Sequence, residues 1–198
     1  NDVFAVTDDG GIDHYDGTGW TTMRDSGSTY GDALWDVWGS SGSDVFAVGH
    51  FTGSGWILHY DGTAWAEMPR GDCVAPALTG VWGTSGSDVY VVSQAGAICH
   101  YDGLDWSIRW TSAPGILSDV WGSASSDVFA VGEQGAILRY DGTDWSPMPS
   151  GTFSDCEGVW GRSSSDVYVV GQAGSILHWD GVTWTGMSAP DATLWLHD

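Results

Sequence analysis

The chain has 198 residues, of which 42% are hydrophobic, and its fourteen Trp and thirty Gly are typical of a folded protein of strands and tight turns. The formal net charge is −21, because 26 acidic residues stand against five Arg and the sequence contains no Lys. Such a surface repels phosphate groups, which argues against nucleic acid and anionic membranes as partners. Apolar runs of membrane-spanning length and a signal peptide are both absent from the sequence, so we expect no membrane insertion.

One sequence unit recurs along the whole chain. In its clearest copy it runs from Val37-Trp38-Gly39 through Asp44-Val45-Phe46-Ala47-Val48-Gly49 to Tyr60-Asp61-Gly62 and Trp65. The turn Asp of each copy (Asp16, Asp61, Asp102, Asp141 and Asp180) follows the last by 45, 41, 39 and 39 residues. A period near forty with four short strands per unit is typical of a propeller blade. We therefore predict that residues 1–198 form a single all-β domain, a five-bladed β-propeller with four-stranded antiparallel blades.

The second unit shows the four predicted strands. They are strand A at Leu34–Trp38, strand B at Asp44–Val48, strand C at Trp56–Tyr60 and strand D at Thr63–Met68. The Asp-Gly pair between strands C and D is the signal of a two-residue type I′ turn. The segment Gly49–Gly55 is an insertion in the loop between strands B and C.

The chain starts at strand B and stops at strand A. A degenerate fifth copy of strand A, Leu194–Asp198, ends the sequence. We expect this strand to complete the first blade and close the ring, which would leave a monomer without an open sheet edge. The alternative is that it pairs with a neighbouring molecule and gives a strand-exchanged oligomer or filament.

Several recurring polar residues are predicted to be structural. Asp44 and its equivalents follow a Ser-rich turn, where an Asp side chain can accept backbone N–H bonds. His14, His59, His100 and His178 share one position of strand C, with Arg139 in the remaining unit. Equivalent positions in packed sheets are about 10 Å apart, too far for one metal ion, so we predict His residues bonded within their own blades and no metal or cofactor.

The three cysteines have neither metal-site spacing nor an even count. Cys99 and Cys156 stand where other units have Leu, which predicts small core residues. A bridge from Cys73 to either of them stays open.

Other residues break the repeat, and they gather on one face of the predicted disc. Because strands alternate in direction, the B–C and D–A loops share this face, and these loops vary between units. Trp35 and Trp56 occupy positions that are small or polar elsewhere, and Trp110 follows Arg109 at the end of a strand D. Aromatic faces stack on sugars or side chains while polar neighbours take hydrogen bonds. The predicted ligand-binding residues are Tyr30, Trp35, His50, Phe51, Trp56, Arg109, Trp110, Asp8, Gln94, Glu133 and Gln172.

The phrase W-G-x-S-x-x-D-V-[FY]-A/V-V-G, followed by G-x-I-x-x-Y-D-G-x-x-W, resembles repeats of bacterial extracellular β-propeller proteins. Five blades in one small chain are also similar to the architecture of tachylectin-type lectins. Only the propeller architecture carries over from these resemblances. On the basis of the variable face and its aromatic residues, we predict a non-catalytic, secreted or cell-surface protein that binds a glycan or a cell-surface protein through that face.

Two other classes of function remain open. One is a glycoside hydrolase with Asp36, Asp119 and Glu157 as carboxylates around a central pocket, although the sequence carries none of the G-x-S-x-G, HExxH or P-loop motifs. The other is a structural propeller that assembles with copies of itself.

Overall fold

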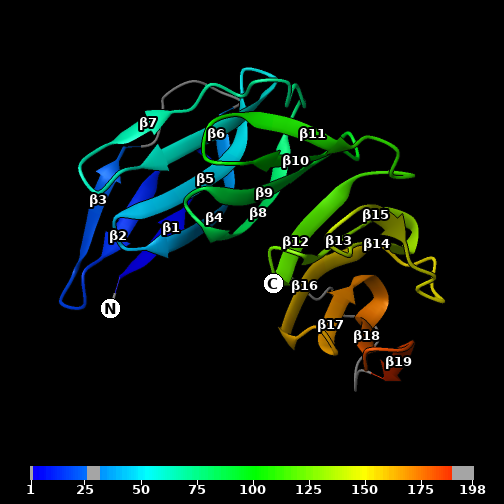
Figure 1. Cartoon of the computed structure of the whole chain (residues 1–198). Helices are drawn as coiled ribbons and strands as arrows, with labels where there is room; N and C mark the ends of the chain where they lie inside the picture. Colours follow the sequence, from blue (N-terminus) through cyan, green and yellow to red (C-terminus); the bar gives the residue numbers. More distant parts are fainter. Residues whose placement is uncertain (1, 26–31, 189–198) are drawn as a thin grey trace.

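The computed structural model describes residues 2–25 and 32–188 as five antiparallel sheets that follow one another in chain order along an arc (Figure 1). The first sheet has three described strands and each of the others has four. In each sheet, neighbouring strands are also consecutive in the sequence. The strands are β1 (Val3–Val6), β2 (Ile12–Tyr15) and β3 (Trp20–Arg24); β4 (Ala33–Ser41), β5 (Asp44–Phe51), β6 (Ser54–Tyr60) and β7 (Trp65–Glu67); β8 (Leu78–Ser85), β9 (Asp88–Ser93), β10 (Ile98–Tyr101) and β11 (Trp106–Trp110); β12 (Leu117–Ala124), β13 (Asp127–Gly132), β14 (Ala136–Tyr140) and β15 (Trp145–Pro147); and β16 (Cys156–Ser163), β17 (Asp166–Gly171), β18 (Ser175–Trp179) and β19 (Trp184–Ser188).

The inner strands of the four complete sheets, β4, β8, β12 and β16, lie side by side, each against the next. The hydrophobic core is divided into layers between successive sheets. One layer joins Phe46 and Ile57 of the second sheet to Leu78 and Val91 of the third, and the next two layers repeat this arrangement. The buried apolar side chains of the strands therefore serve contacts between neighbouring sheets.

The predicted elements are present, with different bounds. β4 extends beyond the expected Leu34–Trp38 at both ends, and β7 is shorter than Thr63–Met68. The predicted loop insertion Gly49–Gly55 instead lengthens β5 and β6 into a hairpin. Thr52 and Gly53 turn it with φ of 48° and 82°, the left-handed conformation of a two-residue turn.

The Asp-Gly turn was predicted wrongly. Between β6 and β7 the connection has four residues, Asp61 to Ala64, and only Gly62 has a positive φ (88°). The Asp61 carboxylate accepts the backbone N–H groups of Thr63 and Ala64 at 2.8 and 3.0 Å. Asp is favoured at this position because its side chain accepts the N–H groups of the turn. Within this turn, Gly62 alone adopts the left-handed conformation.

A pair of side chains repeats in every sheet and confirms the structural role of the His position. The His Nε2 lies 3.0, 2.7, 2.6 and 2.9 Å from an Asp Oδ1 of the neighbouring strand, in the pairs His14–Asp2, His59–Asp44, His100–Asp88 and His178–Asp166. In the fourth sheet Arg139 replaces His and pairs with Asp127 at 2.7 Å. Within the described residues, these Asp carboxylates bond to side chains, including the Ser40 and Thr84 hydroxyls, and not to the backbone N–H groups that we expected.

The expected ring closure is not visible in residues 2–25 and 32–188. Its closing strand, Leu194–Asp198, lies outside the described residues. Trp20 of the first sheet and Trp160 of the fifth are 56% and 53% exposed, so the described parts of these two sheets do not cover one another. Trp106 and Trp145, the equivalents of Trp20, are buried between neighbouring sheets, and Trp38, Trp82 and Trp121, the equivalents of Trp160, pack against the core layers.

Cys73 and Cys99 form a disulfide with a Cα–Cα distance of 5.8 Å. This corrects the prediction that Cys99 is a simple core residue and selects one of the two bridges left open. The bridge ties the segment between β7 and β8 to β10. Cys156 is free and buried, as predicted.

Within residues 2–25 and 32–188, no helix is long and apolar enough to cross a bilayer. Among the same residues, no three His, Cys, Asp or Glu side chains gather as metal ligands would.

Candidate functional site

A pocket of about 410 Å³ opens where the inner strands begin. It is lined by Trp35, Thr79, Gln94, Ile116, Ser118 and Glu157. Four of these, Trp35, Thr79, Ser118 and Glu157, hold the same position of strand A in four successive sheets. Because the inner strands lie side by side, equivalent side chains at their starts converge on one space. The pocket therefore belongs to the whole arc and not to one sheet.

The four equivalent residues make this space chemically uneven. The second sheet supplies an indole, the third and fourth supply hydroxyls, and the fifth supplies a carboxylate. The Thr79 hydroxyl donates to the Leu117 carbonyl oxygen at 2.5 Å, which also links the third sheet to the fourth. Among the described residues of the lining, Glu157 is the one acidic residue.

The predicted polar partners Gln172 and Glu133 are not part of the lining but bond to residues that line the pocket. The Gln172 amide donates from Nε2 to Glu157 Oε1 at 3.2 Å. Glu133 Oε2 accepts the backbone N–H of Ile116, also at 3.2 Å. These bonds fix the orientation of two lining residues, so Gln172 and Glu133 act as positioning residues.

An aromatic cluster extends from the pocket along the second sheet. The Trp35 ring lies 4.8 Å from that of His50 between centroids, and the Phe51 ring lies 5.2 Å from that of Trp56. Trp35 and Phe51 are each partly exposed. The lengthened β5–β6 hairpin carries His50 and Phe51, so the insertion of the second unit positions this cluster.

Trp56 corrects one step of the sequence argument. The sequence predicts its large ring, in a position that is otherwise small, to be a ligand-binding residue. Trp56 is only 4% exposed and packs with Ile12 and Leu34, and the Arg24 guanidinium lies 4.6 Å from its ring centre. It fills the space between the first and second sheets.

Of the remaining predicted residues, Trp110, Arg109 and Asp8 are described and do not line the pocket. Trp110 is half-buried against the core between the third and fourth sheets, and the exposed Arg109 places Nη2 3.3 Å from Nδ1 of His100. Asp8 lies exposed in the turn between β1 and β2. Tyr30 lies outside the described residues.

The proposed catalytic carboxylates Asp36 and Asp119 are bound to the backbone of neighbouring inner strands. Asp36 accepts the N–H groups of Val37 and, in the next sheet, Val81, at 2.8 and 2.7 Å. Asp119 makes the same two bonds to Val120 and Val159, at 2.7 Å each. Both carboxylates thus join two sheets, a structural role that the hydrolase hypothesis did not foresee.

Sequence reasoning missed Thr79, Ile116 and Ser118. The signal was present, because Thr79 and Ser118 are the repeat equivalents of Trp35. Compared with these small or polar residues, Trp35 stands out as an exception. In a ring-like array, however, equivalent residues of neighbouring blades also lie close together, which predicts that the four residues meet.

No family model and no curated protein matches the sequence. Among solved structures, the chain is similar to "Structure of U3-55K" (TM-score 0.76, 8% identity, 98% of this chain and 65% of that chain covered). It is similar in the same degree to "Crystal structure of RRP9 WD40 repeats" (TM-score 0.76, 8% identity, 98% and 64% covered). WD40 repeats build four-stranded propeller blades. The fold is a β-propeller.

Another similar propeller is "YCF48 from Cyanidioschyzon merolae", with a TM-score of 0.67, 16% identity and coverage of 90% of this chain. The chain spans just under two thirds of each of these three structures, 66%, 65% and 64% of their lengths. At such identities the likeness extends to the fold alone. The five described sheets are the blades of this propeller, and the pocket lies where the starts of its inner strands converge.

Proposed function

We propose that this chain is a non-catalytic, protein-binding propeller that takes a cationic side chain of its partner into the pocket. The observation that carries the proposal is the lining itself. At one repeat position the pocket places the partly exposed Trp35 and the carboxylate of Glu157 around a shared space of about 410 Å³.

Lys and Arg side chains fit this lining better than neutral ones. A cation over an indole face gains cation–π attraction, and a carboxylate in the same pocket adds a charge-assisted hydrogen bond. Ile116 offers apolar contact to the aliphatic stem of such a side chain. Gln94, Thr79 and Ser118 supply amide and hydroxyl groups for the polar backbone of a peptide.

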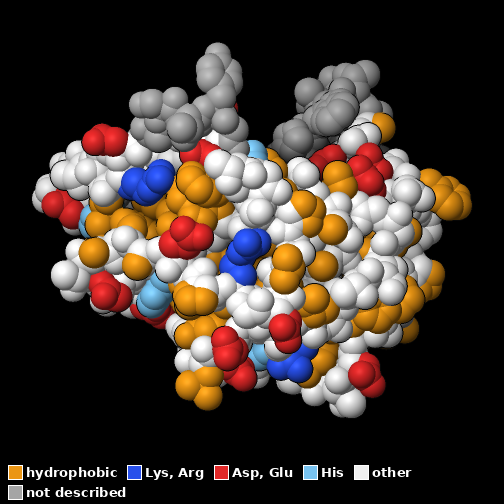
Figure 2. All heavy atoms as spheres, turned by 90° about the horizontal axis from the view of Figure 1, so that it is seen from above, with side chains coloured by type: hydrophobic (Ala, Val, Ile, Leu, Met, Phe, Trp, Pro, Cys, Tyr) orange, Lys and Arg blue, Asp and Glu red, His pale blue; other side chains and the backbone are white. Residues whose placement is uncertain are grey.

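The charge of the whole molecule favours the same class of partner. With a net charge of −21, the propeller attracts basic surfaces and repels acidic ones over a Debye length. Figure 2 shows acidic side chains spread over the face in view, with basic side chains at only a few places.

The compartment that we propose is outside the cell or on its surface. The Cys73–Cys99 disulfide supports this location, because disulfides persist in oxidising compartments and are rare in the cytosol. A glycan is the competing ligand, since an exposed indole also stacks on sugar rings.

The test compares binding of the full chain to immobilised 15-residue peptides, to matched peptides with every Lys and Arg changed to Gln, and to a glycan panel. Trp35→Thr and Glu157→Ser install residues that the third and fourth blades carry at this position, so both variants are expected to fold. The exposed Phe153, on a loop outside the pocket lining, gives the control variant Phe153→Ser.

We expect selective binding of Lys- or Arg-containing peptides that weakens about tenfold or more in Trp35→Thr and in Glu157→Ser, a change of about 1.4 kcal/mol, and stays unchanged in Phe153→Ser. Binding that survives both pocket substitutions contradicts the site. Binding to sugars alone, lost in Trp35→Thr, establishes the lectin instead.

A further inference from the structure

Two departures from the repeat meet at the second blade, next to the candidate site. One is the insertion that lengthens β5 and β6 into a hairpin, and the other is the disulfide between Cys73 and Cys99. Cys99 stands where the second, fourth and fifth sheets have Leu58, Leu138 and Leu177, so the bridge joins one pair of sheets and is not part of the repeat.

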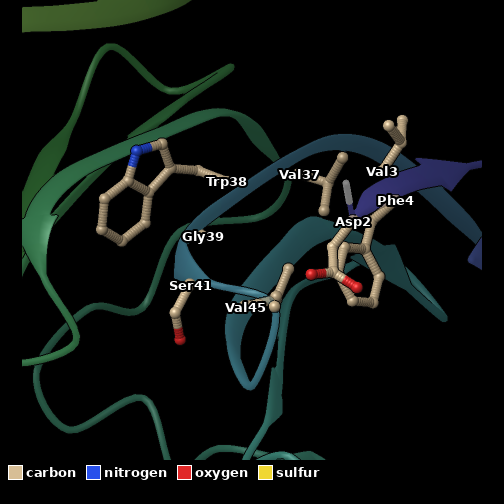
Figure 3. Close-up of a pocket in the computed structure, with 9 residues that line it drawn as sticks. Asp2, Val3, Phe4, Val37, Trp38, Gly39, Ser41 and Val45 are labelled. Carbon is tan, nitrogen blue, oxygen red and sulfur yellow. The ribbon is translucent and has the colours of Figure 1, made fainter. Parts of the chain in front are cut away.

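Neighbouring sheets pack closely with or without a bridge. The Trp of each inner strand lies on a Gly of the next inner strand, and Figure 3 shows the Trp38 ring pointing toward the third sheet and away from Phe4. A Cβ built on the Gly would come within 2.9, 2.5 and 2.6 Å of the ring in the pairs Trp38–Gly83, Trp82–Gly122 and Trp121–Gly161. Of these three pairs of sheets only the first carries a disulfide, so we expect the chain to fold as a propeller without it.

The segment that contains Cys73 reaches from the third sheet to the hairpin. Just before Cys73, the backbone N–H of Asp72 donates to the Trp106 carbonyl oxygen at 3.2 Å. Two residues after Cys73, the Ala75 carbonyl oxygen accepts the N–H of Gly55, in the hairpin, at 2.8 Å. A Cβ built on Gly55 would lie 2.7 Å from the same oxygen, so the segment and the hairpin are in direct contact.

The corresponding segment of the fourth blade has no bridge and takes a different course. Both segments begin with Met-Pro-x-Gly, which ends at Gly71 and Gly151. A Cβ built on Gly71 would lie 2.5 Å from the Trp106 carbonyl oxygen of the next sheet, whereas one built on Gly151 meets nothing in the described chain within 4 Å beyond its chain neighbours. Phe153 follows Gly151 as Cys73 follows Gly71, and Phe153 is 93% exposed while Cys73 is fully buried. We infer that the bridge holds the segment against the third sheet.

The hairpin carries this support to the pocket. Gly55, which bonds to Ala75, is directly opposite His50 in the ladder of β5 and β6. The His50 ring lies 4.8 Å from that of Trp35, which lines the pocket. The contacts therefore run without a break from the disulfide through the hairpin to the indole of the candidate site.

We propose that oxidation of Cys73 and Cys99 to the disulfide completes the candidate site, with both cysteines as positioning residues. The reduced chain is a folded propeller whose hairpin lacks its support, so His50 and Trp35 are held less firmly and the cationic side chain of the partner binds more weakly. The inference rests on the proposed function of the pocket, whose regulation it supplies.

The chemical step is thiol–disulfide exchange with a small-molecule disulfide such as glutathione disulfide. The two thiols give up two protons and two electrons as their S–S bond forms, and glutathione disulfide takes them up and becomes two thiols. Once formed, the bond is shielded, because Cys73 and Cys99 are 0% and 1% exposed and an attacking thiolate must reach one of the sulfur atoms. The site is therefore completed in an oxidising compartment and then persists.

The experiment compares three forms of the full chain. They are the chain purified in dithiothreitol, the same chain after oxidation with glutathione disulfide, and the double variant Cys73→Ala, Cys99→Ala. Leu138→Ala is the control, because Leu138 is the buried equivalent of Cys99 in the fourth sheet and its truncation opens a core cavity between the third and fourth sheets. Circular dichroism and thermal unfolding check each form, and loss of the cooperative transition in both the reduced chain and the double variant overturns the proposal.

Hydrogen exchange of single amides tests the support of the hairpin without any ligand. We expect the Gly55 amide to exchange about tenfold faster or more in the reduced chain and in the double variant than in the oxidised chain. The Gln172 amide, which donates to the Asp155 carbonyl oxygen, is the internal reference and should exchange equally in all three forms. Equal exchange of the Gly55 amide in the oxidised and reduced chains overturns the proposal.

Binding to the Lys- and Arg-containing peptides of the preceding test gives the second readout. We expect affinity to fall about tenfold or more in the reduced chain and the double variant, to return when the reduced chain is oxidised, and to stay unchanged in Leu138→Ala. Equal affinity of the oxidised and reduced chains overturns this proposal and leaves the proposed function intact. Absence of binding in every form, with faster exchange at Gly55 on reduction, contradicts the proposed function and shows that the bridge supports the hairpin for another purpose.

Discussion

At the scale of single residues, the five hairpin-turn Asp residues show how a short hydrogen-bond pattern sets acidity. Backbone N–H bonds lower the pKa of Asp61, Asp102, Asp141 and Asp180. The pKa of Asp16 falls furthest, from 3.8 to about 2, first because the Thr18 hydroxyl donates to its carboxylate and then because Thr18 and Gly19 donate backbone N–H groups. The charged form is favoured in the fold, so these residues stabilise the protein above about pH 4, and their contribution is lost as the pH falls toward 2.

A substitution in the turn tests this cause. Thr18→Val removes the hydroxyl but keeps the backbone N–H, so the pKa of Asp16 is expected to rise toward 3.8, as measured by NMR titration of the carboxyl carbon. Thr63→Val is the matched control, because the bonds that lower the pKa of Asp61 come from the backbone alone. An unchanged Asp16 pKa in Thr18→Val, or an equal rise for Asp61 in Thr63→Val, would contradict the assignment.

At the scale of the strands, the inner edge of the propeller alternates between two ways of joining sheets. Asp36 and Asp119, in the second and fourth sheets, each connect their own sheet to the next through two backbone N–H groups, and Gly80 and Gly158 hold the same position in the third and fifth sheets. A Cβ at Gly80 would lie 3.1 Å from the Asp119 Cα, so the close approach of neighbouring inner strands favours Gly there. The same strand position thus holds an Asp that hydrogen-bonds two sheets together in one blade and a Gly that allows the strands to approach closely in the next.

Removal of one connector is expected to destabilise the fold. Asp36→Ala leaves two backbone N–H groups without their acceptor and is expected to lower the free energy of unfolding by about 1–3 kcal/mol, measured by urea denaturation. Asp105→Ala, in an exposed hairpin loop, is the control. A loss below about 0.5 kcal/mol, the range of ordinary surface substitutions, would show that the connector contributes little.

At the scale of the whole molecule, the net charge of −21 opposes the compact state. Self-repulsion of like charges destabilises a folded protein, and salt screens it, with a Debye length of about 10 Å at 0.1 M. Positive charges that could offset the acids are scarce, since only five Arg are present.

Added NaCl is therefore expected to raise the melting temperature at neutral pH. A gain of about 1 kcal/mol between 20 and 500 mM NaCl corresponds to about 2–4 °C for a chain of this size, as followed by calorimetry. The same titration at pH 3.5 is the control, because protonation of carboxylates reduces the repulsion and the salt effect with it. A melting temperature that falls with NaCl at neutral pH would show that attractive ion pairs outweigh the repulsion.

The sequence by itself determined the five repeats, their strand order, the structural His position and the face on which the repeat varies. These features are encoded locally, in the two-residue period of the strands and in the copies of one phrase. It misplaced strand ends, the Asp-Gly turn and the role of Trp56, because each depends on what the neighbouring strand or sheet leaves room for.

Only the tertiary structure decided which residues meet. The convergence of Trp35, Thr79, Ser118 and Glu157, the Cys73–Cys99 bridge and the link from Asp36 to Val81 join residues from different units of the repeat. Sequence copies fix what each blade contains, but the distance between equivalent side chains depends on how closely the inner strands approach one another. That approach is set by packing between sheets, for which no single repeat carries the information.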